Sequence, residues 1–184
     1  RVAVTEVLSL VDPVMVTRSG HGLLSVEAEA VVSHPLLPMA TLITPNIPEM
    51  EALSGITLTS RKAKDDAARR MMEWGARSIL LKGGHEEGDL KTDILYTLSN
   101  GKIETSLFTS ETITTRNIHG TGCTLSAAIT ALMTRGLPIA EAIAEAKRYI
   151  SEAIRAGADV SIGHGLGPVN HGFNPLKMLI YETT

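Results

Sequence analysis

The segment Asn117-Ile-His-Gly-Thr-Gly-Cys-Thr-Leu-Ser126 sets two glycines and a threonine before a cysteine and opens into a helix of small residues, expected over Thr124–Thr134. A Gly-Thr-Gly turn at a helix start leaves backbone N–H groups unpaired at the positive end of the helix dipole. Glycine also lets a phosphate approach the backbone closely. The pattern therefore predicts an anion site, although a glycine loop before a core helix with one buried thiol would look the same. The residues of this predicted cradle are Gly120, Thr121, Gly122 and Cys123.

Three apolar runs each deliver a polar side chain to the end of an expected strand. Val11–Val16 carries Asp12 and predicts a buried strand. Leu42–Glu51 predicts a strand, a proline turn with Asn46, and a helix with Glu49 in its first turn; Ser78–His85 predicts a strand that delivers Lys82 into a glycine turn. Ligands bind beyond the carboxyl ends of strands in open parallel α/β sheets, so we expect these groups to share one site.

The rest of the chain alternates between helical and extended patterns. The expected elements are a helix over 1–10, a glycine-bearing loop over 17–22, helices over 26–33, 49–54, 60–74, 124–134 and 139–156, and hairpin strands over 93–99 and 102–109. Strand–helix alternation predicts an α/β fold with a mostly parallel central sheet, helices on both faces and an antiparallel hairpin, as one domain over 1–184. Because Leu10 runs into Val11 without turn residues, we expect residues to be absent there and before Arg1.

Composition excludes several classes of function. A net charge of −3 with no basic cluster gives no reason to expect nucleic-acid binding. No apolar run approaches the ~20 residues of a membrane span. The single cysteine excludes an internal disulfide and suits a reducing compartment such as the cytoplasm. Hydrophobic residues make up 43% and aromatic residues 3% of the chain, which predicts an aliphatic core.

Six motifs in order resemble the ribokinase-like superfamily, and most closely its hydroxymethylpyrimidine/phosphomethylpyrimidine kinases of thiamin biosynthesis, with pyridoxal kinases as near relatives. The motifs are Asp12-Pro-Val-Met-Val16, Thr44-Pro-Asn-Ile-Pro-Glu49, Leu81-Lys-Gly-Gly-His85, Asp93-Ile-Leu-Tyr96, His119-Gly-Thr-Gly-Cys-Thr-Leu-Ser126 and Gly163-His-Gly-Leu-Gly-Pro168. The cysteine is the most specific of these features, because sugar kinases of the superfamily carry an aspartate there. The family's N-terminal portion, which carries a glycine-rich segment and residues that hold the pyrimidine, has no match in this chain.

The resemblance implies a three-layer ribokinase-like fold and an ATP- and Mg²⁺-dependent kinase, acting as a homodimer. Its substrate would be a small pyrimidine, 4-amino-5-hydroxymethyl-2-methylpyrimidine, and then the monophosphate. Pyridoxal kinase activity is the second interpretation, since both substrates are hydroxymethyl heteroaromatics. A fragment that binds nucleotide or pyrimidine without turnover is the third.

The resemblance also implies a role for each candidate residue, and each has a plainer alternative. Cys123 would be the base that accepts the hydroxyl proton, or would only line the pocket while the cradle carries most of the rate. Lys82 would contact the nucleotide phosphates; the alternative is an exposed lysine after a strand.

For the other candidates the alternatives are structural. Asp12 and Glu49 would hold Mg²⁺, whose ligands are oxygen atoms; the alternatives are a surface acid and a helix N-terminal acid. Asn46 would contact nucleotide or metal-bound water, or only form a turn. Val14 matches the family's backbone contact to the pyrimidine ring.

Overall fold

The computed structural model describes residues 8–15, 36–84 and 88–175. The elements in chain order are β1 (Leu10–Val11), a 3₁₀ turn (Leu37–Met39), β2 (Leu42–Ile43), α2 (Ile47–Ser54), α3 (Arg61–Glu73), β3 (Ser78–Leu81), β4 (Leu90–Ser99), β5 (Lys102–Glu111), α4 (Thr121–Thr134) and α5 (Ile139–Gly157). The predicted loop at 17–22 and helix at 26–33 lie outside the described residues.

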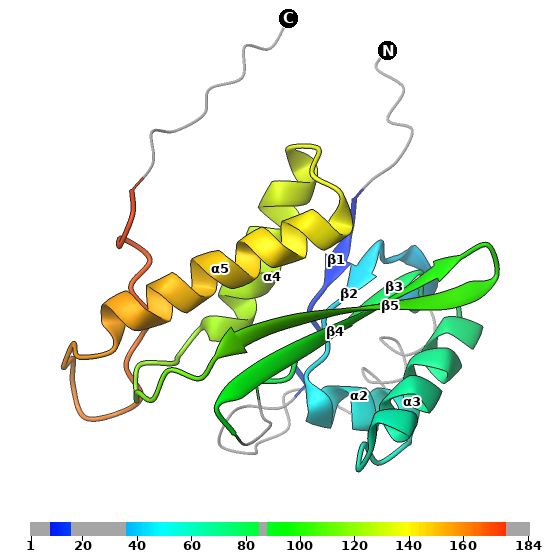
Figure 1. The fold of residues 1–184 in the computed structure, drawn as a ribbon, viewed down its shortest axis with the longest axis horizontal. Coiled ribbons are helices and arrows are strands. Elements are labelled where there is room, and N and C mark those ends of the chain that lie inside the picture. The colour runs from blue at the N-terminus through cyan, green and yellow to red at the C-terminus, as the bar shows by residue number, and fades with distance from the viewer. Residues whose placement is uncertain (1–7, 16–35, 85–87, 176–184) are drawn as a thin grey trace, which may run out of the picture.

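The strands form one sheet in the order β1-β2-β3-β4-β5 (Figure 1). The first three strands are parallel, with Leu10 opposite Leu42 and Ile43 opposite Ile79, whereas β4 is antiparallel to both β3 and β5. The described strands therefore form a mixed sheet, with two parallel and two antiparallel pairings, in which the predicted hairpin supplies the antiparallel part. The chain passes from β3 to β4 through a short loop, and a parallel pairing there would need a longer crossover.

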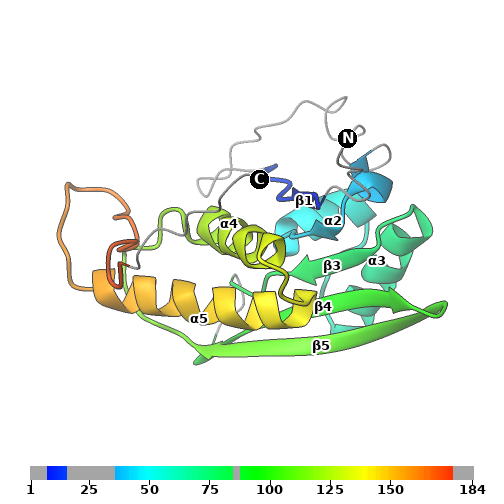
Figure 2. The same cartoon turned by 90° about the horizontal axis from the view of Figure 1, so that it is seen from above.

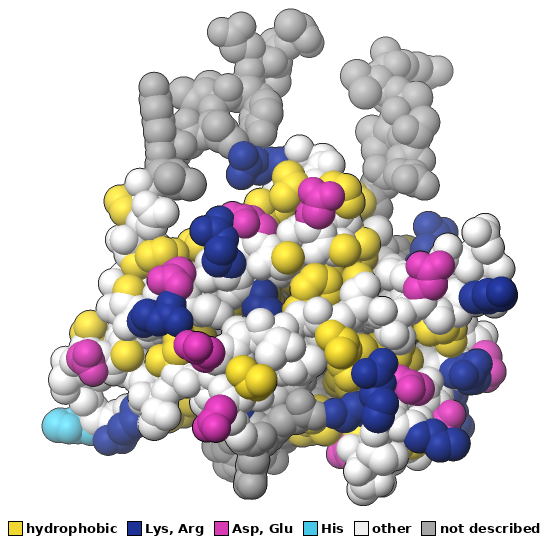
Figure 3. Space-filling model, in the orientation of Figure 1, with side chains coloured by type: hydrophobic (Ala, Val, Ile, Leu, Met, Phe, Trp, Pro, Cys, Tyr) yellow, Lys and Arg dark blue, Asp and Glu magenta, His cyan; other side chains and the backbone are white. Residues whose placement is uncertain are grey.

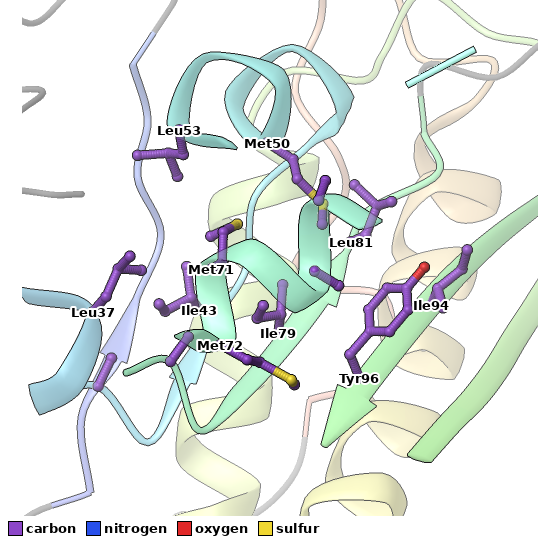
Figure 4. Close-up of a cluster of buried hydrophobic side chains, with 14 of the residues drawn as sticks. Leu37, Ile43, Met50, Leu53, Met71, Met72, Ile79, Leu81, Ile94 and Tyr96 are labelled. Carbon is purple, nitrogen blue, oxygen red and sulfur yellow. The ribbon is translucent and has the colours of Figure 1, made fainter. Parts of the chain in front are cut away.

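Helices cover both faces of the sheet, as the alternation predicted. Helices α2 and α3 lie on one face and α4 and α5 on the other (Figures 1 and 2). Neighbouring strand residues point to opposite faces. Thus Ile79 and Leu81 join the core under α3, where Met71, Met72 and Tyr96 pack (Figure 4), while Leu80 joins the core under α5.

The end of α2 and the start of α3 follow from their capping residues. Ser60 caps α3 through a side-chain bond from the Ala63 amide, and Gly55 ends α2 at a positive φ of 68°. Asn100 and Gly101 form the turn of the β4–β5 hairpin, both at positive φ. These boundaries and the hairpin agree with the sequence predictions.

Two boundaries differ from the predictions. Leu10 lies in β1 and Val11 follows it in the same strand, in step with Leu42 and Ile43, so the expected helix does not reach Leu10. The lack of a turn between Leu10 and Val11 therefore no longer indicates missing residues. Strand β1 also ends at Val11, before Asp12, because Pro13 cannot donate to a ladder.

The surface of the α5 and hairpin side mixes both signs of charge. Basic and acidic side chains are interspersed there, with apolar side chains between them (Figure 3). This pattern fits the small net charge of −3. Within the described part of the chain, the structure has no helix long and apolar enough to cross a membrane.

Candidate active site

A chain of polar contacts joins the carboxyl ends of the three parallel strands to α4. The Lys82 ammonium donates to Asp12 Oδ1 at 2.8 Å, and the Ser126 hydroxyl donates to Asp12 Oδ2 at 3.0 Å. Ser126 Oγ also lies 3.0 Å from the Thr44 hydroxyl at the end of β2. Asp12 and Lys82 keep only 14% and 11% of their side chains exposed. The structure thus unites the predicted metal carboxylate and the predicted phosphate lysine in one buried ion pair.

The predicted anion cradle forms the N-terminal turn of α4. Gly120 is its N-cap at a φ of 84°, a conformation that suits glycine, and the helix begins at Thr121. Helical residues therefore replace the turn expected at Thr121 and Gly122, and α4 starts three residues earlier than predicted. The first bond of the helical ladder runs from the Thr124 amide to the Gly120 carbonyl, so the Gly122 and Cys123 amides precede it at the positive end of the dipole.

Lys82 lies against this helix end. A Cβ built on Gly122 would stand 3.6 Å from Lys82 Nζ, so the ammonium lies beside the first turn of α4. Ser126 follows Gly122 by four residues and shares its face of the helix. One face of α4 therefore presents free amides at its tip and the hydroxyl that holds Asp12 one turn further on. A cation beside unbonded amides suits an anion of high charge, such as a phosphate.

Asn46 and Glu49 form a capping box at the start of α2. The Glu49 amide donates to Asn46 Oδ1 at 2.9 Å, and the Asn46 amide donates to Glu49 Oε2 at 2.8 Å. Glu49 is buried, with 3% exposed. Asn46 also forms a parallel bridge with Lys82, whose amide donates to the Pro45 carbonyl at 2.8 Å. Asn46 therefore acts as a turn and capping residue, and Glu49 as a helix N-terminal acid, as the structural alternatives expected. The bridge to Lys82 puts the start of α2 beside that lysine.

Val14 and Cys123 are the exposed members of the predicted set. Cys123 lies in the first turn of α4 with its thiol open to solvent. Val14 is 39% exposed and adopts a φ of 41°, which is strained for a β-branched residue. Because Val14 comes two residues after Asp12, this strained backbone lies at the edge of the same strand-end region.

The segment that leads into α4 is tied to the late glycine loop. The buried Asn117 amide group donates to the Gly157 carbonyl at 2.6 Å and to the Val160 carbonyl. The His119 amide donates to the Gly167 carbonyl at 3.0 Å, and His119 bridges Pro168. These bonds fix the approach to Gly120 from two sides. The loop over 163–168 is therefore bonded to the segment that leads into the cradle.

Sequence reasoning assigned no role to four further residues of this region. Thr44 and Ser126 stand inside the quoted motifs, and the spacing of Ser126 from Gly122 was a usable signal for its position. Asp93 and Lys147 form a buried ion pair at 2.7 Å behind the glycine turn that follows Lys82. They lie 54 residues apart in the chain, so no local pattern could pair them.

The mixed sheet with helices on both faces defines an α/β architecture of three layers, with a candidate anion site where the strand ends meet the N-terminus of α4. A family model described as phosphomethylpyrimidine kinase matches residues 3–170. The chain therefore belongs to the phosphomethylpyrimidine kinase family, and its ribokinase-like fold is confirmed.

Individual relatives agree with this membership. The thiamine biosynthesis bifunctional protein ThiED of Geobacter sulfurreducens is 44% identical over 162 residues, which are 88% of this chain and 32% of the relative. The hydroxymethylpyrimidine/phosphomethylpyrimidine kinase of Staphylococcus aureus strain Mu50 is 41% identical over 164 residues, covering 88% of this chain and 57% of the relative.

A solved structure resembles the fold closely. The pyridoxal kinase from Staphylococcus aureus in complex with AMP-PCP superposes with a TM-score of 0.78 and 33% identity, covering 90% of this chain and 58% of that one. That kinase thus holds an ATP analogue. The chain spans between a third and three fifths of the length of these relatives.

Proposed function

We propose that this chain carries the phosphoryl-transfer site of an ATP-dependent kinase that phosphorylates 4-amino-5-hydroxymethyl-2-methylpyrimidine and then its monophosphate to the diphosphate. One observation carries the proposal: the Lys82 ammonium lies beside Gly122 in the first turn of α4, where the amides of Gly122 and Cys123 have no backbone acceptor among the described residues. Membership in the phosphomethylpyrimidine kinase family supplies the acceptor.

The arrangement suits an in-line transfer from ATP. The transferring phosphoryl group spreads its charge over three oxygens, and catalysis rests on positioning and on charge stabilisation. The amides at the tip of α4 and the Lys82 ammonium would accept that charge. The substrate hydroxyl oxygen would bond to the γ-phosphorus as the bond to ADP breaks, and its proton would pass to the Cys123 sulfur. Asn46 would contact the nucleotide from the start of α2, and the Val14 backbone would contact the pyrimidine.

Magnesium would be held through Asp12 and Glu49. Their carboxylate oxygens are the donors that Mg²⁺ takes; Asp12 pairs with Lys82, and Glu49 accepts the amide of Asn46, which bridges Lys82. No group of three or more acidic, histidine or cysteine side chains suited to a metal occurs among the described residues. The fit is therefore to an ion that takes most of its ligands from phosphates and water. Such an ion would neutralise phosphate charge.

Pyridoxal kinase activity is the second candidate, favoured by the TM-score of 0.78 to the pyridoxal kinase from Staphylococcus aureus. ADP release with either acceptor at equal concentration separates the two. Turnover that depends on the pyrimidine supports the proposal, and turnover that depends on pyridoxal supports the alternative. A folded chain that binds MgADP without turnover would identify a nucleotide-binding piece of a longer enzyme.

The base assignment has its own test. Because Cys123 is exposed, its thiol contributes little to packing, and Cys123→Ser should leave folding unchanged. We expect turnover to fall by about 10²-fold or more, as general bases contribute, with the affinity for MgATP little changed. Unchanged turnover would remove the base role and leave the cradle as the source of the rate. We also propose a homodimer, which the resemblance to the kinase family supports, and a cytoplasmic location, which the single cysteine supports.

A further inference from the structure

The turn after Lys82 is held by a buried carboxylate that the phosphoryl chemistry does not use. Asp93 lies on β4, next to Ile94, which pairs with Leu81 at the end of β3. Its Oδ1 accepts the Gly83 amide at 2.8 Å, and its Oδ2 accepts the Lys147 ammonium at 2.7 Å. Asp93 and Lys147 are only 4% and 7% exposed. A single carboxylate thus joins the glycine turn to the middle of α5.

Stability alone is a poor reason for this ion pair. Replacing a buried pair with well-packed apolar residues is often neutral or stabilising, because desolvation offsets the attraction. The Lys147 ammonium compensates the charge of the Asp93 carboxylate in the core. Asp93 also accepts a hydrogen bond from the Gly83 amide. Gly83 directly follows Lys82, the lysine proposed to contact the nucleotide phosphates, so this bond bears on the position of Lys82.

Lys82 is held on both sides of its own peptide unit. Its amide donates to the Pro45 carbonyl at 2.8 Å, which ties it to the start of α2. The next amide, of Gly83, is tied to Asp93. The backbone direction at Lys82 is therefore fixed, and its side chain runs to Asp12 and to the tip of α4. A turn rich in glycine has many conformations open to it unless such bonds exclude them.

We propose that Asp93, paired with Lys147, is a positioning residue that fixes the turn over 82–84 so that the Lys82 ammonium stays at the N-terminus of α4. This inference rests on the proposed function, because it takes Lys82 as the contact to the nucleotide phosphates. Asp93 acts through the Gly83 amide and touches no reacting group.

Two double variants separate positioning from stability. Asp93→Leu/Lys147→Met and Asp93→Asn/Lys147→Met both remove the ion pair, but only the asparagine variant keeps an oxygen that can accept the Gly83 amide. The leucine variant leaves the Gly83 amide without its acceptor and frees the turn that aims Lys82, so we expect MgADP affinity, measured by titration calorimetry, to weaken about tenfold or more. The asparagine variant should rescue it to within about threefold of wild type. Equal affinities in the two variants overturn the proposal.

A matched control removes a pair of the same length elsewhere. Lys62 and Asp66 are 2.7 Å apart on the exposed face of α3, and Lys62→Met/Asp66→Asn should leave MgADP affinity unchanged. A loss of affinity in this control equal to that of the leucine variant would show that lost charge alone explains the result, and would overturn the positioning role.

Hydrogen exchange at the Gly83 amide tests the same bond without nucleotide. In the wild-type chain this amide should exchange as slowly as the amides of β3, and it should accelerate in the leucine variant but not in the asparagine variant. Fast exchange in the wild type overturns the inference whether or not the variants fold. Failure of the wild type to bind MgADP would instead contradict the proposed function. Slow exchange of the Gly83 amide would still support the positioning of the turn by Asp93.

Discussion

Removing the Lys82 ammonium should destabilise the fold through Asp12. Breaking a buried ion pair from one side typically costs about 3–5 kcal/mol, because the other charge stays buried without compensation. Here Asp12 is 14% exposed and keeps the bond from Ser126, so we expect the lower end, about 3 kcal/mol for Lys82→Met. The double variant Asp12→Asn/Lys82→Met leaves no such charge and should lose only about 1 kcal/mol.

A double-mutant cycle measured by urea unfolding checks this reasoning. Asp12→Asn, the other single variant, keeps an oxygen that can accept from the Lys82 ammonium and should cost about 1 kcal/mol, so the coupling free energy between Asp12 and Lys82 should be about 3 kcal/mol. The same cycle on Lys62 and Asp66, which are 84% and 43% exposed at a similar distance, should give at most about 0.5 kcal/mol. Coupling at the strand-end pair as small as at the surface pair would refute the view that Asp12 and Lys82 form a buried pair.

Three further predictions concern stability. Gly167→Ala would place a Cβ 1.8 Å from Asn117 Oδ1 and should cost about 2–3 kcal/mol in urea, whereas Gly165→Ala, with nothing within 4 Å, should cost less than about 0.5; equal costs would show that the clash is absent. Val14→Gly should raise the free energy of unfolding by about 0.5–1 kcal/mol by relieving the positive φ, while Val14→Ala gives no such gain; a loss on Val14→Gly would contradict the strain. Burial raises the pKa of Tyr96 above its ordinary value, so the folded state holds the phenol proton more tightly, and this contribution is present below about pH 10 and lost as the pH rises further. Tyr96→Phe should therefore lose less stability than wild type between about pH 9 and 11.5, and identical slopes would count against the shift.

Local chemistry made much of the fold predictable. Ser60, Gly55 and Asn100-Gly101 are capping and turn residues whose backbone preferences act within a few positions, and the helix ends and the hairpin follow from them. The start of α4 was misplaced because Thr121 and Gly122 are weak helix formers. Helical geometry begins there since Gly120 takes the N-cap at positive φ.

Contacts between residues far apart in the chain limited how much of the site could be predicted from the sequence. Sequence order predicted that Asp12, Asn46 and Lys82 would meet at one edge of the sheet, and the contacts around Lys82 confirm it. No pattern predicted that Asp12 and Lys82 would pair with each other, since both were interpreted as ligand contacts. The ion pair of Asp93 and Lys147 joins β4 to α5. It forms only once the helical layer has packed on the sheet, so no local sequence pattern could predict it.

The most direct test of the proposed kinase is the identity of its product. The chain is incubated with MgATP and 4-amino-5-hydroxymethyl-2-methylpyrimidine, and the products are resolved by mass spectrometry, with Lys82→Met as the control that removes the phosphate contact. The proposal predicts the pyrimidine monophosphate first and the diphosphate later, both strongly reduced in the control. A folded wild-type chain that binds MgATP but forms neither product, or that phosphorylates only pyridoxal, would contradict the proposed pyrimidine kinase activity.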